Sequence, residues 1–122
     1  MVRRNRPEDE LQKTVVEWLR LMERKGDFVM FSIPNEGART PAAAQRLKNL
    51  GRRAGMPDLG LIFRNGRIHF IEMKAKQGTL TPNQKLMHDA LRAMGCDVAI
   101  CRTFEEVQGT VNAWMVGMRR AA

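Results

Sequence analysis

The sequence has few cysteines and few aromatic residues, and it contains no tyrosine. Cys96 and Cys101 are its two cysteines among 122 residues, and no cluster of further ligands stands at metal-binding spacing around them. We therefore expect two reduced cysteines in the core rather than a disulfide framework. Aromatic residues make up 6% of the chain, so a platform for stacking nucleic-acid bases is not expected.

Long apolar segments are also absent. No run is long enough to span a bilayer, and the basic start of the chain is not followed by the apolar stretch of a signal peptide. We therefore expect a cytoplasmic protein without a membrane partner, folded as one domain over residues 1–122.

Acidic residues are outnumbered by basic ones. The chain has 21 Lys and Arg against 13 Asp and Glu, a formal net charge of +8. Such an excess is typical of proteins that neutralise phosphates. Unspecific binding to polyanions would give the same excess, so the charge indicates nucleic acid but not an enzyme.

Hydrophobic periodicity and capping residues predict the order helix, strand, helix, hairpin, helix, strand, helix. This order is typical of an α/β sandwich, a mixed sheet flanked by helices. Thr40-Pro41 and Thr81-Pro82 each combine an N-cap with a proline in the first turn, and Thr103 with Glu106 predicts a capping box. The helices are expected at 7–26, 40–50, 81–94 and from 103 onward, and the strands at 28–33, 58–63, 67–75 and 98–101.

Two carboxylates and a lysine fall in the predicted hairpin. Glu72 and Lys74 lie two residues apart on a strand and therefore project from one face. A two-residue turn at Asn65-Gly66 would set position 58 opposite 73, whereas a three-residue loop from Arg64 sets it opposite 72. We expect the three-residue loop with Gly66 left-handed, because it makes Asp58 a direct neighbour of Glu72.

Adjacent carboxylates repel each other and favour a divalent cation between them, and carboxylate oxygens suit Mg²⁺ or Mn²⁺. Such a cation would bind a phosphodiester oxygen and activate a water, while Lys74 would position that water or stabilise developing negative charge. The backbone carbonyl of Met73 is a further candidate ligand. The alternative is structural: Glu72 and Lys74 form a strand ion pair and Asp58 caps a turn.

Several segments together resemble a known family. The chain contains, in order, Ile33-Pro34-Asn35-Glu36-Gly37, Gly55-Met56-Pro57-Asp58-Leu59, Ile71-Glu72-Met73-Lys74 and Gly78-Thr79-Leu80-Thr81-Pro82-Asn83-Gln84. With the N-terminal helix, they resemble the VRR-NUC group of PD-(D/E)xK nucleases, especially its stand-alone, virus-type members, over nearly the whole chain.

The resemblance implies a restriction-endonuclease-like fold and metal-dependent cleavage of DNA. It implies that Asp58 and Glu72 bind the metal and that Lys74 completes the site. It also implies a homodimer, a preference for branched DNA such as Holliday junctions, and a role in recombination, repair or viral DNA processing in a bacterial or virus-infected cell.

The family also has a glutamate on the first helix. Glu8 and Glu10 both qualify, and Glu8 is favoured because it lies on the inward stripe with Leu11, with Gln12 one turn later. A favourable interaction of acidic residues with the helix dipole would explain either glutamate equally well.

Related nucleases carry a glutamine at the start of the helix that follows the active strand, and here this is Gln84. It orders the site or contacts the nucleic acid in those proteins, and Gln84 and His88 are one turn apart. For His88 we expect an exposed polar side chain, and for His69 a satisfied strand histidine.

Basic and polar residues flank the proposed site in sequence and are candidate DNA contacts. They are Asn35, Arg39, Lys48, Arg52, Arg53, Lys76 and Lys85. Two further classes of function remain open: a catalytically silent nucleic-acid-binding module, and a subunit of a larger repair or packaging complex.

Overall fold

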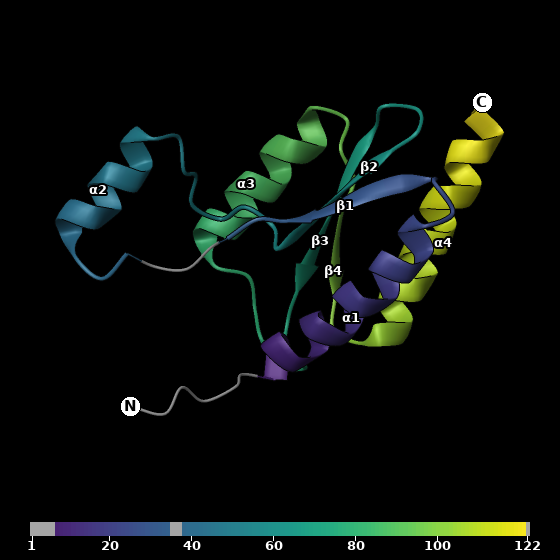
Figure 1. Ribbon diagram of the computed structural model, residues 1–122. Helices are drawn as coiled ribbons and strands as arrows, with labels where there is room; N and C mark the ends of the chain where they lie inside the picture. The colour runs from purple at the N-terminus through teal and green to yellow at the C-terminus, as the bar shows by residue number, and fades with distance from the viewer. Residues whose placement is uncertain (1–6, 35–37, 122) are drawn as a thin grey trace.

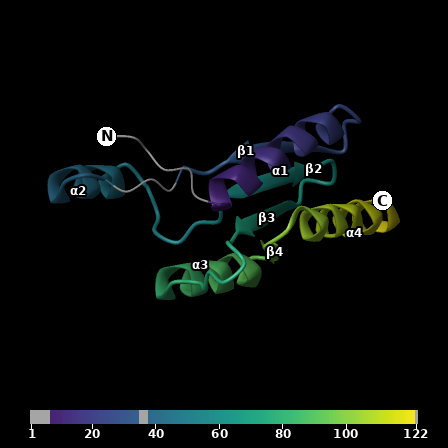
Figure 2. The same cartoon turned by 90° about the horizontal axis from the view of Figure 1, so that it is seen from below.

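The protein is a mixed α/β structure with helices on both faces of a central sheet (Figures 1 and 2). The computed structural model describes residues 7–34 and 38–121. The predicted order of elements is confirmed. The elements are α1 (Pro7–Glu23), β1 (Phe28–Ser32), α2 (Pro41–Asn49), β2 (Leu59–Phe63), β3 (Ile68–Met73), α3 (Pro82–Ala93), β4 (Val98–Cys101) and α4 (Phe104–Ala121).

The four described strands form one sheet in the order β1-β2-β3-β4. β1 pairs with β2 and β2 with β3 in antiparallel fashion, whereas β3 pairs with β4 in parallel. A parallel pair needs a crossover connection, and α3 provides it. Within the described residues, no helix has the length and apolar character needed to cross a membrane.

The main core lies between the sheet and the layer formed by α1 and α4. Leu59 and Leu61 of β2 and Ile71 of β3 are fully buried there, against residues such as Val15 of α1 and Val111 of α4. Because side chains alternate along a strand, the even-numbered residues of β2 and β3 point to the opposite face, where α3 lies. The candidate site residues are among these even-numbered positions.

The register of the β2–β3 hairpin is the one predicted. Leu59 pairs with Ile71 and Ile62 with Ile68, and the Phe63 N–H donates to the Arg67 carbonyl at 2.8 Å. Gly66 has φ +82°, in the left-handed region. The three-residue loop is therefore confirmed, and the next pair beyond β2 sets position 58 opposite position 72.

The cap predictions hold at two helices and partly at a third. The Thr40 side chain accepts from the Ala43 N–H at 3.1 Å, and Thr81 and Gln84 form a full capping box at the start of α3. Thr103 caps α4, but the Glu106 carboxylate accepts from the Arg102 N–H at 3.2 Å instead of completing the box.

The two cysteines are free, as expected, but only Cys101 is in the core. Cys96 lies in the turn before β4 and is partly exposed, because the apolar segment containing it starts as a loop and becomes strand only at Val98. His69 is a satisfied strand histidine: its Nδ1 accepts from the Asp97 N–H at 3.1 Å, and its ring stacks on Trp114.

The loop before Asp58 packs directly on the start of α3, at Gly55. Gly55 has φ +81°, and a Cβ there would lie 2.3 Å from the Asn83 backbone oxygen. Glycine is required at this position both for its backbone conformation and for the close approach of α3. The contact places the segment leading to Asp58 against the helix that carries Gln84.

We predict that Gly55→Ala destabilises the protein by more than Gly66→Ala does. Gly66 has a similar φ of +82° but open space around it, so alanine there costs only the left-handed conformation, about 1–2 kcal/mol. At Gly55 the clash with α3 adds roughly 1–3 kcal/mol. Urea unfolding measures the free energy of unfolding of each variant. Equal decreases for the two variants would show that the close approach of α3 at Gly55 does not contribute to stability.

Candidate active site

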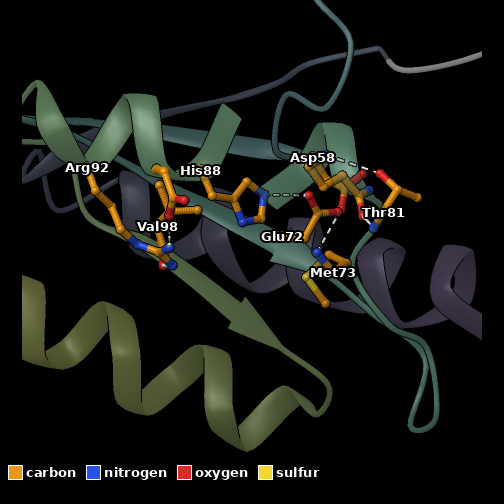
Figure 3. Close-up of polar contacts among 9 residues, drawn as sticks. Asp58, Glu72, Met73, Thr81, His88, Arg92 and Val98 are labelled. Atoms are coloured by element: carbon orange, nitrogen blue, oxygen red, sulfur yellow. Dashed lines mark hydrogen bonds and ion pairs between the residues drawn. The ribbon is translucent and has the colours of Figure 1, made fainter. Parts of the chain in front are cut away.

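Asp58 stands where the pairing of β2 with β3 stops. Continuing the register would pair Met73 with residue 57, but this is a proline and has no N–H to donate. The Met73 N–H instead donates to Asp58 Oδ2 at 2.7 Å (Figure 3). On the other side, the Ile33 N–H donates to the Asp58 backbone carbonyl at 2.8 Å. Asp58 is therefore held by the extensions of two neighbouring strands.

Glu72 projects from β3 toward α3 and is almost completely buried, with 2% exposure. Its Oε1 lies 3.1 Å from Nε2 of His88, which is 0% exposed (Figure 3). The expectation of an exposed His88 is wrong. His88 lies one turn from Gln84 and three residues before the partly buried Leu91, and this inward face of α3 is the signal that identifies it.

α3 is fixed against the sheet at its other end. The Arg92 guanidinium donates to the Val98 carbonyl of β4 at 2.8 Å, also drawn in Figure 3. This contact and the Thr81 cap hold the two ends of α3. The position of the buried His88 ring beside β3 is consequently well determined.

Lys74 shares the face of Glu72 and is 8% exposed. It lies beyond the last residue of β3, and its N–H donates to the Cys101 carbonyl at 3.0 Å. Among the described residues, Glu72 contacts the His88 ring, and no ion pair joins it to Lys74. Neither part of the structural alternative is observed, because the Asp58 carboxylate accepts from the neighbouring strand rather than within a turn and no Glu72–Lys74 ion pair is present among the described residues.

The electrostatics of the site penalise ionisation of Glu72. Burial above all, then the hydrogen bond and charge of Asp58, raise the pKa of Glu72 to about 9, and Lys74 opposes this shift. Burial, reinforced by Arg92 and Lys74, lowers the pKa of His88. Glu72 therefore retains its proton near neutral pH in the metal-free protein, beside a neutral imidazole.

A cavity of about 1240 Å³ opens over these side chains between α2 and α3. Figures 1 and 2 both show α2 standing away from the sheet on the side where this cavity lies. Its lining combines acidic, basic and apolar groups. It includes Glu8, Asp58, Glu72, Lys74 and Gln84 at the site, Lys48, Arg52 and Arg53, and Leu47, Met56, Leu86 and Met87.

Of the two candidate helix glutamates, Glu8 lines this cavity and Glu10 does not. Glu8 is close enough to contribute to the raised pKa of Glu72. Gln12, expected on the same face, instead lines a separate groove between α1 and β1, because α1 turns away from the site along the sheet. Within residues 7–34 and 38–121, no three His, Cys, Asp or Glu residues are grouped as metal ligands, so Glu8 lies near the pair without closing a three-residue set.

Gln84 combines a structural contact with a place at the cavity. Its Oε1 accepts from the Thr81 N–H at 3.0 Å, which completes the cap of α3. The amide nitrogen is then the part of this side chain that is suited to donate to a ligand.

The candidate DNA contacts fall into two groups. Lys48, Arg52 and Arg53 line the cavity, and the Arg52 guanidinium also donates to the Pro34 carbonyl at 3.4 Å. The exposed side chains of Arg39, Lys76 and Lys85 lie outside the cavity lining. Asn35 lies outside the described residues.

The donor atoms at the site suit a hard divalent cation. Asp58 and Glu72 supply carboxylate oxygens that repel each other. In a strand, the N–H and the carbonyl of one residue point to the same edge, so the Met73 carbonyl points toward β2, as its N–H does. Opposite it stands Pro57, which has no N–H to donate to this carbonyl. Two carboxylates, one carbonyl and an open cavity for water match the preference of Mg²⁺, which retains several waters when protein-bound.

The comparisons place the chain in a nuclease-type family. Residues 1–105 match the model of the VRR-NUC domain family, and the chain belongs to this family. One solved structure, described as a VRR_NUC domain, is 24% identical with a TM-score of 0.60, covering 86% of this chain and 94% of that one. A VRR_NUC domain protein is 22% identical with a TM-score of 0.69, covering 91% and 89%. No curated protein matches the chain.

We predict that Glu72→Gln stabilises the metal-free protein near pH 8. The pKa of Glu72 rises from 4.5 to about 9 on folding, so ionisation of Glu72 in the unfolded chain lowers the stability of the fold increasingly as the pH rises above 4.5. Glutamine keeps hydrogen-bonding groups toward His88 and Asp58 but cannot ionise. The gain should be about 2 kcal/mol or more at pH 8 and vanish below about pH 4.5.

Thermal melting in EDTA at both pH values measures this effect. The exposed Glu17 of α1 provides the matched control, and Glu17→Gln should leave the pH profile unchanged. If Glu72→Gln melted at or below the wild-type temperature at pH 8, Glu72 would be stabilised in its ionised form.

Proposed function

We propose that the protein is a metal-dependent endonuclease that hydrolyses phosphodiester bonds in DNA, with Mg²⁺ or Mn²⁺ held by Asp58 and Glu72. The observation that carries this proposal is the buried Glu72 carboxylate beside Asp58 at the floor of a cavity that Lys48 and Arg53 also line. Placing the buried Glu72 carboxylate beside the partly buried Asp58 carboxylate raises the energy of the free protein, and a cation between them relieves it. Family membership supports a nuclease-type activity.

The residues of the chain would divide the work as follows. Asp58, Glu72 and the Met73 carbonyl hold the cation, which supplies an activated water and neutralises phosphate charge when bound. Lys74 is almost buried on the same face, where its ammonium group would stabilise negative charge on the scissile phosphate or orient the water. Addition of water across the P–O bond then leaves a phosphate monoester and a free hydroxyl.

Two finer expectations come from the family resemblance. They are a preference for branched DNA such as four-way junctions and a homodimeric state. The cavity supports recognition of backbone and shape rather than base sequence, because its lining contains no aromatic side chain among the described residues. A catalytically silent binding module remains the second candidate, since basic residues alone are sufficient for binding.

We predict metal-dependent cleavage that Lys74→Ala slows strongly while DNA binding persists. Labelled duplex, flap and four-way-junction DNA are incubated with protein in Mg²⁺, Mn²⁺ or EDTA, and the rate should fall by about 10²–10³-fold in the variant. Lys25→Ala is the matched control, because Lys25 is exposed, lies outside the cavity lining and is not among the candidate DNA contacts. Tight binding without cleavage of any substrate under any metal would favour the binding module.

We further predict that the cavity-lining cations Lys48 and Arg53 contact phosphates. In the Lys74→Ala background, replacing both by alanine should weaken duplex binding and lower the slope of log affinity against log salt by about 2. Alanine at Arg120, in the last turn of α4 at the other end of the molecule (Figure 1), serves as control. Equal slopes for the double variant and the control would place the DNA elsewhere.

A further inference from the structure

His88 is a buried polar residue whose presence packing does not explain. It is 0% exposed, and within residues 7–34 and 38–121 its side chain makes a polar contact with Glu72 alone. The second ring nitrogen, Nδ1, is buried and has no partner among the described residues. An unsatisfied buried polar atom costs on the order of 1–3 kcal/mol, so an apolar side chain would be more favourable here if filling space were the only requirement.

The geometry points to His88 as a positioning residue that fixes the metal-binding carboxylate of Glu72, an inference that rests on the proposed function. With its proton on Nε2, His88 donates to Glu72, and Nε2 lies 3.1 Å from Oε1. The unpaired Nδ1 then carries only a lone pair. The other tautomer would bury an unpaired N–H at Nδ1, so the geometry favours the Nε2–H form.

The consequence concerns which oxygen of Glu72 faces the cation. Figure 3 shows Glu72 between His88 on one side and Asp58 on the other. Since His88 holds Oε1, the other carboxylate oxygen of Glu72 faces Asp58. This arrangement favours binding of the cation through that one oxygen. Asp58 is held in the same manner, because its Oδ2 accepts from the Met73 N–H at 2.7 Å. Each carboxylate thus has one oxygen fixed by an N–H donor.

Two substitutions separate positioning from packing. His88→Gln places an amide nitrogen where Nε2 stands and retains the donor, whereas His88→Leu fills the space without one. Mn²⁺ binding to the DNA-free protein, followed by electron paramagnetic resonance, should weaken by about 10–100-fold in His88→Leu and by no more than about threefold in His88→Gln. This measurement does not depend on cleavage.

The outcomes distinguish this inference from the proposed function. The proposed metal site fails if the wild type does not bind Mn²⁺, or if Glu72→Gln binds Mn²⁺ as well as the wild type does. If the wild type binds and His88→Leu binds equally well, the positioning role is overturned. A purely structural role would lower the melting temperature in EDTA and leave the Mn²⁺ affinity of the folded protein unchanged.

A measurement on the wild type covers the case in which His88→Leu fails to fold. Nitrogen-15 NMR of the histidine rings in the Mg²⁺-loaded protein should show His88 as the neutral Nε2–H tautomer, with its signals shifting as Mg²⁺ is added. A Nδ1–H tautomer, or signals that do not respond to Mg²⁺, would overturn the inference.

Discussion

The three-residue loop at the tip of the β2–β3 hairpin is the constraint on which core and site both depend. With Gly66 left-handed, Leu59 pairs with Ile71 and both face the α1–α4 layer. The same register sets Asp58 beside Glu72 on the opposite face. A turn shorter by one residue would move Asp58 to the face of Met73, within the core. The hydrophobic alternation of both strands therefore specifies the arrangement of the carboxylates.

The site exists because the ladder ends early at Pro57. Because Pro57 has no N–H, the Met73 carbonyl has no donor opposite it in the ladder. The Met73 N–H donates instead to the Asp58 side chain at 2.7 Å. Burial of Glu72 under α3 then raises its pKa, because the charged form loses hydration beside a second carboxylate. Apolar packing on the other face of the sheet has to offset the free-energy cost of burying Glu72. On β3, fold stability and site chemistry therefore favour different residues.

Local signals were sufficient to predict the elements and the hairpin register, since proline, glycine and capping residues act over a few positions. They were insufficient where tertiary packing decides. Gln84 and His88 do share one face of α3, but whether that face is inward depends on how α3 sits on β3, and His88 proved buried. Gln12 shares a helix face with Glu8 yet lies at another groove, because α1 passes along the sheet. Arg39, Lys76 and Lys85, which are near the site in sequence, do not line the cavity, and their DNA contacts stay a prediction.

The energetics of the Glu72–His88 pair bear on the choice between an enzyme and a binding module. Binding of DNA through exposed cations gains nothing from a buried carboxylate whose pKa is raised to about 9, nor from a buried imidazole with an unpaired nitrogen. Glutamine and leucine at these positions would keep the shape of α3 on β3 and remove both unfavourable terms. A charged, oriented carboxylate is useful where a cation has to be held in a defined geometry. The unfavourable groups are therefore concentrated where the proposed chemistry needs them.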